Sequence, residues 1–217
     1  MKLFAFDSPV MQAISTATDY VILNLLWIVC SLPVFTAGAA MSAKYYTSMK
    51  LYRGEAPAVF KSFFSSFAKN LKQTILPSIV IFIIMGALTA DWFYVINVTQ
   101  DPAYKWILFI ITVVFFMMIF CLFPIIARYE IKTKEAVKTA LGLTAAKFPR
   151  VFLAIILFIL PFIIGIWYFK WAWLICLFSQ TVMLYYNSGF FVKEFDKLEA
   201  RLFGENEENA QKNDTEG

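Results

Sequence analysis

Several segments of the chain are apolar over a length that is sufficient to cross a lipid bilayer. A membrane-spanning helix needs about 20 predominantly apolar residues. Segments of this kind run over residues 74–96, 104–127, 151–168 and 171–191. Of the 217 residues, 60% are hydrophobic and 16% are charged, which is more apolar surface than one soluble domain buries. The sequence therefore predicts an integral membrane protein.

A fifth span is expected near the start of the chain, where residues 24–43 carry no charge. Its helix should begin near Pro9, because proline at the first helical position has no amide hydrogen to leave unsatisfied. Pro33 and Gly38 interrupt the apolar run, and carbonyl groups freed by such a break in hydrocarbon must be covered by neighbouring helices. We therefore expect a packing centre here. Its small residues permit close helix approach: Gly38, Ala39, Ala40, Ser42 and Ala43.

Two amphipathic helices are expected between the first span and the second. The first follows Ala43, mixes basic with apolar residues, and ends at Gly54 and Pro57, which are typical helix terminators. The second carries its apolar residues on one face and its lysines elsewhere, a pattern typical of a helix on a membrane surface. Its apolar face consists of Phe60, Phe63, Phe64, Phe67 and Leu71.

Lysine and arginine residues are divided unevenly between the two predicted sides of the membrane. Residues 44–72 contain six, residues 128–150 contain six and the segment after 191 contains four, whereas the opposite side holds Lys2, Lys105 and Lys170. Basic connectors remain in the cytoplasm, so five spans place the N-terminus outside. In a rival arrangement, residues 36–53 turn back across the bilayer, which gives six spans and an internal N-terminus. Lys44 and Lys50 within so short a span argue against this arrangement.

The predicted fold class is an all-α polytopic transmembrane helical bundle of about five spans with cytoplasmic amphipathic helices. Residues 1–204 are expected to form a single transmembrane domain. Residues 205–217 form a polar C-terminal tail with too little apolar surface to fold. A weak tandem repeat is visible, because residues 30–35 resemble 121–126 and residues 67–72 resemble 145–150. Chance similarity between Phe-rich helices is the alternative explanation.

The sequence contains little that supports enzymatic chemistry. It has no histidine, which excludes a Ser-His or Cys-His catalytic pair and removes a common metal ligand. Its three cysteines all lie in apolar runs, where packing is their usual role. No phosphate-binding loop, hydrolase motif or catalytic carboxylate pair is present. We therefore expect no enzyme, no catalytic residues, no cofactor and no metal. The basic residues are spread over several loops, which also argues against nucleic-acid binding.

Two groups of polar residues are the candidate sites. Asn24, Gln180 and Asn187 lie within predicted spans, where they either line a solute path or form hydrogen bonds between helices, and helix packing is the favoured interpretation. The second group lies on the cytoplasmic amphipathic segments, at the level of anionic headgroups. It consists of Lys69, Lys72, Lys147 and Arg150. Membrane anchoring is preferred for this group over contact with a protein partner.

Several motifs resemble one known family. They are Phe4-Ala-Phe-Asp-Ser-Pro9, Asn24-Leu-Leu-Trp27, Ser31-Leu-Pro-Val-Phe-Thr-Ala-Gly-Ala-Ala40 and Phe63-Phe-Ser-Ser-Phe-Ala-Lys-Asn-Leu-Lys-Gln73. These segments resemble the YesL-like bacterial membrane proteins, a family of unknown function. The resemblance implies a multi-pass protein of the bacterial plasma membrane, often encoded beside carbohydrate ABC transporters. The family has no established catalytic residues, so the resemblance implies none here.

Two functional hypotheses follow. The first is a non-enzymatic accessory or regulatory protein of carbohydrate uptake, which binds the lipid bilayer and the membrane subunits of a sugar ABC importer. The alternative is a small-solute transporter or channel in its own right, with Asn24, Gln180 and Asn187 along its path. An enzyme that acts on a lipid-linked substrate is a third possibility, without support from any residue.

Overall fold

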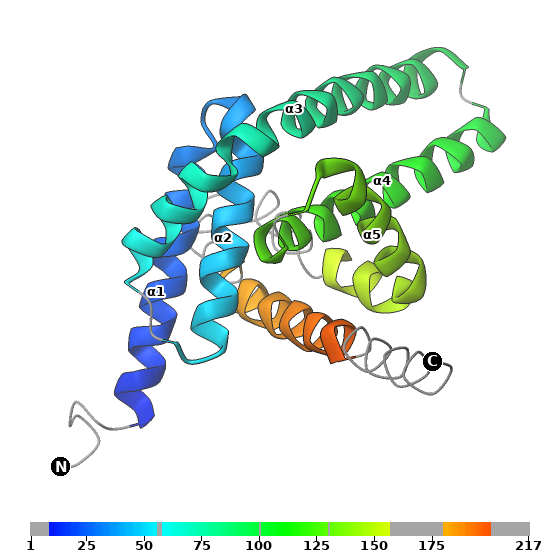
Figure 1. The fold of residues 1–217 in the computed structure, drawn as a ribbon. Coiled ribbons are helices and arrows are strands. Elements are labelled where there is room, and N and C mark those ends of the chain that lie inside the picture. Colours follow the sequence, from blue (N-terminus) through cyan, green and yellow to red (C-terminus); the bar gives the residue numbers. More distant parts are fainter. Residues whose placement is uncertain (1–8, 56–57, 100, 130, 157–179, 201–217) are drawn as a thin grey trace, which may run out of the picture.

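The computed structural model of the chain describes residues 9–55, 58–99, 101–129, 131–156 and 180–200. Over these residues every regular element is helical, as the sequence predicts. The main helices are α1 (Pro9–Cys30), α2 (Ala37–Tyr52), α3 (Val59–Tyr94), α4 (Pro102–Arg128) and α5 (Thr133–Ala146). Two short helices, Val34–Thr36 and Val95–Thr99, lie in connections, and residues 180–200 form a further helix, here called the C-terminal helix. Figure 1 shows these elements as one bundle with a projecting pair of helices.

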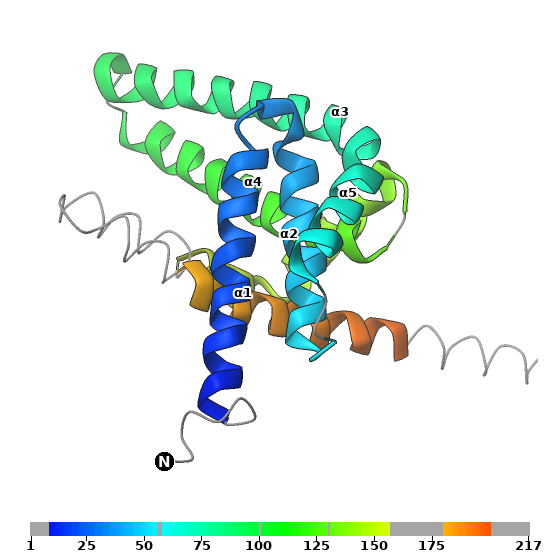
Figure 2. The ribbon, with the colours of Figure 1, turned by 90° about the vertical axis from the view of Figure 1, so that its left-hand side faces the viewer.

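The first two helices form a hairpin. α1 begins at Pro9, as predicted, and ends at Cys30. The chain then turns, and α2 runs back alongside α1 (Figures 1 and 2). The prediction that residues 24–43 form one helix with an interrupted end is therefore wrong, because the break at Pro33 is the turn between two antiparallel helices. The path of α2 is that of the six-span alternative, although α2 is not among the helices that are long and apolar enough to span a membrane.

The break between α1 and α2 is covered locally. The Thr36 hydroxyl oxygen lies 2.7 Å from the carbonyl oxygens of Cys30 and Pro33. Its hydrogen can thus be donated to carbonyl groups that the end of α1 leaves without an intrahelical partner. A side chain six residues beyond Cys30 therefore covers these carbonyls, while the expected coverage by neighbouring helices stays a prediction.

α2 is the central helix of the bundle and contacts α1, α3 and α4. A Cβ atom at Gly38 would lie 2.2 Å from Ser78 Oγ of α3 and 2.8 Å from a ring carbon of Phe123 of α4. The Gly38 amide donates a hydrogen bond to Ser78 Oγ over 3.1 Å. The predicted packing role of the small residues is confirmed, since all of them are buried. The prediction of an amphipathic surface helix after Ala43 is wrong for its first part, because Lys44 and Tyr45 are also buried.

α3 is one continuous helix of 36 residues. The predicted surface helix and the predicted span 74–96 are therefore not separate elements, and Pro77 lies inside the helix without ending it. The first half of α3 packs on the bundle through Phe63 and Ser66, which are at most 4% exposed. Within the second half, the side chains of Phe82 and Ile83 are 59% and 64% exposed. The first half of α3 thus contacts the other helices of the bundle, whereas the second half exposes large apolar side chains.

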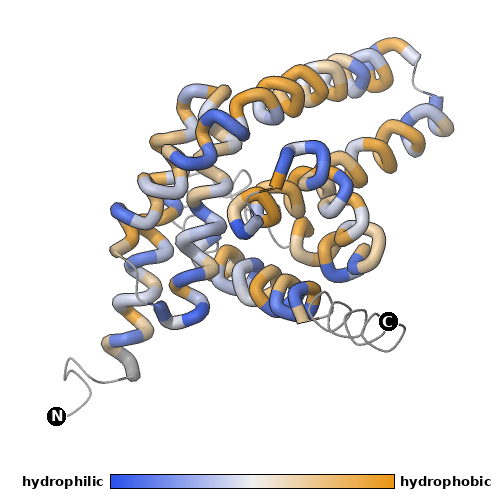
Figure 3. Tube along the Cα trace, in the orientation of Figure 1, coloured by the Kyte–Doolittle hydropathy of each residue, from blue (hydrophilic) through white to orange (hydrophobic). Residues whose placement is uncertain are grey.

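The outer half of α3 and the first half of α4 form a second hairpin, here called the α3–α4 hairpin. It projects from the bundle in both ribbon views (Figures 1 and 2), and most of its residues are hydrophobic (Figure 3). Asp101 caps α4, because its carboxylate accepts a hydrogen bond from the Ala103 amide over 2.9 Å. The two helices are joined near their outer ends, where Trp92 Nε1 donates to Thr112 Oγ1 over 3.1 Å.

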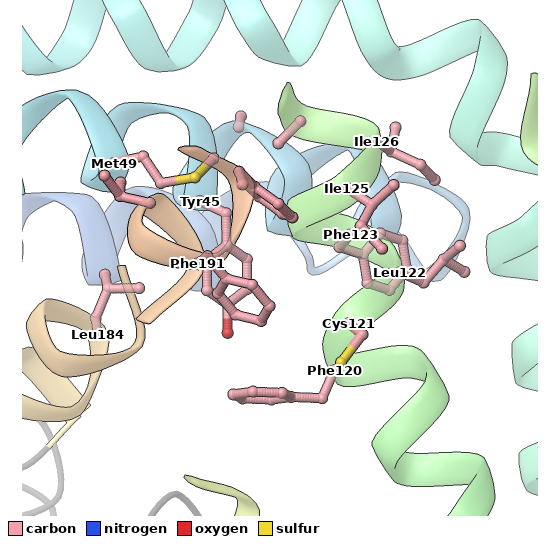
Figure 4. Close-up of a cluster of buried hydrophobic side chains, with 14 of the residues drawn as sticks. Tyr45, Met49, Phe120, Cys121, Leu122, Phe123, Ile125, Ile126, Leu184 and Phe191 are labelled. Carbon is pink, nitrogen blue, oxygen red and sulfur yellow. The ribbon is translucent and has the colours of Figure 1, made fainter. Parts of the chain in front are cut away.

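The bundle core forms where α2, α4 and the C-terminal helix meet (Figure 4). The Tyr45 ring contacts Phe120 and Phe191 edge to face, with ring centroids 6.4 Å and 5.6 Å apart. Such aromatic pairs add about 0.5–1.5 kcal/mol each beyond the burial of their surface. The second half of α4, from Phe120 to Ala127, is buried almost throughout. Pro124 is thus inside α4, whereas Pro33, its counterpart in the predicted repeat, lies in a turn.

Within the described residues, three helical segments are long and apolar enough to cross a membrane: Met11–Cys30, Val59–Thr99 and Pro102–Arg128. A fourth span results if α5 and the helix Phe148–Ile156, which are bent by 94° relative to each other, are counted as one broken span. The chain is therefore a helical membrane protein. The predicted span 151–168 falls largely outside the described residues, the predicted span 171–191 is described from residue 180 onward, and the tail 205–217 falls outside the described residues entirely.

Candidate functional site

A network of buried polar side chains joins α1, α2 and the C-terminal helix. Tyr20 donates its hydroxyl hydrogen to the Ser48 carbonyl over 3.0 Å. The Ser188 hydroxyl lies 2.8 Å from Ser48 Oγ and 2.6 Å from the Leu184 carbonyl. Tyr20, Ser48 and Ser188 are at most 1% exposed. Because a buried polar group without a partner is costly, these bonds fix the positions of the three helices relative to one another.

Asn24 extends this network by one helical turn along α1. Its Nδ2 donates to Thr181 Oγ1 of the C-terminal helix over 3.1 Å. Its side-chain oxygen, by contrast, is buried without a hydrogen-bond partner. Asn24 is 2% exposed, so bulk water does not satisfy this acceptor. The network therefore contains one open acceptor at the centre of the bundle.

Lys44 is the one strongly perturbed cation on α2, a helix outside the candidate spans. The residue is 2% exposed, and its Nζ lies 4.1 Å from the centre of the Trp27 ring. Among the described residues no carboxylate lies within ion-pair distance of Lys44. Burial lowers the pKa of Lys44 to about 7, because the charged ammonium loses its hydration.

Helix register brings Lys44 and Asn24 to the same level of the bundle. α1 and α2 are antiparallel, and Tyr20 contacts Ser48. One turn onward in α1 is Asn24, and one turn back in α2 is Lys44. The central cluster, defined as Asn24, Trp27, Lys44, Ser48 and Thr181, thus combines an amine, an open amide oxygen and hydroxyl groups. Such a set can donate and accept hydrogen bonds.

Two of the predicted solute-path residues lie close to this cluster in the chain. Gln180 directly precedes Thr181, and Gln180 and Asn187 are 7% and 4% exposed. They are seven residues apart, which places them on the same face of the C-terminal helix. Between α1 and this helix lies a groove of about 360 Å³, lined by Tyr20 and Thr181 among others. The structure brings Asn24 to the start of the C-terminal helix, while the solute path itself stays a prediction.

The predicted surface cations occupy two different settings. Lys69 and Lys72 are exposed on α3. Lys147 and Arg150 instead contact Glu194 of the C-terminal helix, at 3.1 Å and 3.3 Å. Glu194 is 7% exposed, so these two cations compensate a buried carboxylate and hold two parts of the chain together. A role at the membrane surface stays a prediction for all four residues.

Further ion pairs fasten the C-terminal helix to the bundle. Arg53, directly after α2, pairs with Asp196. Arg128, the last residue of α4, donates two hydrogen bonds of 3.1 Å and 3.0 Å to one Glu199 oxygen and a third of 3.2 Å to the other. Bidentate arginine–carboxylate pairs are among the stronger charge contacts in proteins. Glu194, Asp196 and Glu199 therefore connect the C-terminal helix to the segment after α5, to the end of α2 and to the end of α4, respectively.

Sequence reasoning missed Lys44 as a candidate site residue. The signal available was a single lysine that directly follows a run of small residues, Gly38 to Ala43. Small residues indicate close helix packing. Close packing of a helix favours burial of a lysine that lies beside these small residues. In the part of the chain that the structure describes, no group of three or more His, Cys, Asp or Glu side chains is placed to hold a metal ion.

Comparison with known proteins relates part of the chain to a protein family. No curated protein and no solved structure matches the chain. Residues 20–92, which are 73 of the 217 residues, match the model of one family. This region contains most of α1, all of α2 and most of α3. The chain is thus similar, over α1 to α3, to the family DUF624, which is described as a protein of unknown function.

Proposed function

We propose that this protein is a non-enzymatic accessory protein of the bacterial plasma membrane, which assists carbohydrate uptake by binding the transmembrane subunits of a sugar ABC importer. Its basic segments and C-terminus lie on the cytoplasmic side. The carbohydrate part of the proposal rests on the resemblance to the YesL-like proteins, and the orientation rests on the distribution of lysine and arginine.

The α3–α4 hairpin is the observation that supports binding to another membrane protein. Its apolar side chains point outward along both helices, with Ile83, Trp106 and Ile110 between 59% and 67% exposed. Gly86 and Ala90, four residues apart, are also exposed. Small residues at this spacing allow two membrane helices to approach closely. The hairpin thus offers a membrane-embedded surface that the bundle does not use.

Co-purification tests the proposal. The tagged protein is extracted in a gentle detergent, and the sugar-importer subunits recovered with it are quantified. Gly86→Leu should lower their recovery several-fold, because it blocks close approach, while a Cβ atom at Gly86 meets nothing within 4 Å in the protein itself. Ala87→Leu is the matched control, since the next residue is turned by about 100° around the helix. Recovery of the protein alone, with unchanged sugar uptake in a deletion strain, would contradict the proposal.

A second candidate function is a small-solute transporter or channel. The observation that favours it is the central cluster. Asn24 donates a hydrogen bond to Thr181, and its side-chain oxygen has no hydrogen-bond partner. Lys44 lies at the same level of the bundle. Asn24→Leu should then abolish solute flux into liposomes containing the purified protein. Thr18→Val is the control, because Thr18 is on the same helix and, among the described residues, its hydroxyl group forms a hydrogen bond with the Ile14 carbonyl of α1 alone. Flux that survives Asn24→Leu would remove this candidate.

A further inference from the structure

α5 and the helix that follows it meet at a sharp corner. They are bent by 94° relative to each other, and Lys147 is the residue between them. α5 contains two lysines and a glutamate in 14 residues, which is too polar and too short for a span. The helix Phe148–Ile156 is apolar throughout apart from Arg150 in its first turn. A polar helix and an apolar helix at a right angle are typical of a chain that leaves the membrane surface and enters the bilayer.

A groove lies beside this corner, between α5 and the C-terminal helix. It has a volume of about 470 Å³, within the usual range of small-molecule sites. Leu143, Phe195 and Leu198 supply apolar lining, and Lys147 and Lys197 supply charge. Gly142 also lines the groove, and a Cβ atom there would meet nothing within 4 Å.

The charge around the groove is unbalanced. Glu194 is approached by three cations: Lys147 at 3.1 Å, Arg150 at 3.3 Å and Lys197 at 3.8 Å. One carboxylate neutralises one of them, so these four described side chains together retain an excess of two positive charges. The side chains of Arg150 and Lys197 are 64% and 62% exposed, and they remain accessible to an anion from outside. The groove is thus complementary to a ligand with an apolar part and a negative charge.

The surface beside the groove identifies the source of such a ligand. Leu141 of α5, together with Phe148 and Leu153 beyond the corner, is between 46% and 55% exposed. These side chains place exposed apolar surface on both helices of the corner, which fits contact with acyl chains. We infer that the groove at the α5 corner binds an anionic phospholipid, with the phosphate at Lys147, Arg150 and Lys197 and part of an acyl chain over Gly142 and Leu143.

Lipid titration of the purified full-length protein tests this inference. Mixed micelles of a non-ionic detergent with phosphatidylglycerol are added, and thermal stability reports binding. Phosphatidylglycerol should raise Tm in a saturable way, and phosphatidylcholine should raise it much less. Lys197→Gln should weaken the apparent affinity for phosphatidylglycerol about fivefold, as expected for one basic residue near a headgroup. Lys138→Gln, an equal charge change on an exposed residue of α5 outside the groove, should leave the affinity unchanged.

A second variant tests the apolar part of the site without changing any charge. Gly142→Leu fills the groove, and its helix should remain intact because leucine is a better helix former than glycine. It should weaken phosphatidylglycerol binding at least as much as Lys197→Gln, while Tm in the absence of lipid should be no lower than that of the wild type. Equal stabilisation by the two lipids, no effect of Gly142→Leu, or equally strong competition by soluble glycerol 3-phosphate would each overturn the inference.

Discussion

Replacing Lys44 by methionine removes the buried ammonium group while keeping a long unbranched side chain. Lys44 is 2% exposed, and burial lowers its pKa from 10.5 to about 7. Because one pKa unit corresponds to about 1.4 kcal/mol, the buried amine costs on the order of 4 kcal/mol of folding free energy at pH 7. The contact with the Trp27 ring offsets part of this, since a desolvated cation–π contact contributes about 2 kcal/mol.

We therefore expect Lys44→Met to raise the free energy of unfolding at pH 7 by about 1–3 kcal/mol, as is common when apolar side chains replace buried charges. In a chain of this size, each kcal/mol corresponds to an increase in Tm of about 2–4 °C. The assay is thermal unfolding of the purified protein in detergent. Lys50→Met is the control, because Lys50 is on the same helix but its side chain is 36% exposed and paired with Glu55.

The same reasoning predicts a pH dependence. Between pH 7 and pH 10.5 the unfolded chain retains a proton on Lys44 that the folded protein has released. Stability of the wild type therefore rises with pH over this window. The advantage of Lys44→Met should shrink as pH increases from 7 to 10. A variant that is less stable than wild type at pH 7, or a difference that is constant over this range, would refute the reasoning.

Three further substitutions test the packing, the break and a helix cap, each by thermal unfolding. Gly38→Leu should destabilise the protein by about 1–3 kcal/mol, because overpacking forces α2 away from its neighbours. Gly86→Leu should not destabilise it, because there is open space around Gly86. Equal effects of the two substitutions would contradict the packing argument. Thr36→Val should cost about 1 kcal/mol through loss of the bond to the carbonyls at the break, and an unchanged Tm would show that other groups cover them. Asp101→Ala should cost about 0.5–2 kcal/mol through loss of the cap on α4, whereas Asp101→Asn should retain most of it.

Hydropathy explains which parts of the prediction succeeded. The predicted span 104–127 lies within α4, and the predicted span 74–96 lies in α3 and the first residues of the short helix that continues it. Both are helical because a long apolar segment in lipid must satisfy its backbone internally, and the helix is the local way to do so. The start of α1 at Pro9 and the turn at Gly54, whose φ is +74°, follow from the backbone chemistry of single residues. These features depend on neighbours in the chain alone.

Features that depend on distant residues were predicted poorly. The sequence pattern around Phe60 to Leu71 is that of a surface helix, yet this segment continues into the next span as α3. An apolar face indicates that something covers it. Whether that partner is another helix, such as α2, or lipid is decided by the tertiary fold. Lys147 and Arg150 show the same limit, because their partner Glu194 is more than 40 residues away.

The sequence by itself determined that this chain is helical and enters a membrane, because apolar length and backbone satisfaction are local properties. Only the tertiary structure decided that the break at Pro33 is a hairpin turn, that Lys44 is buried over Trp27, and that three cations surround Glu194 beside a groove. Each of these depends on which helices pack together. That choice is made by shape and charge between segments far apart in the chain, which hydropathy does not encode.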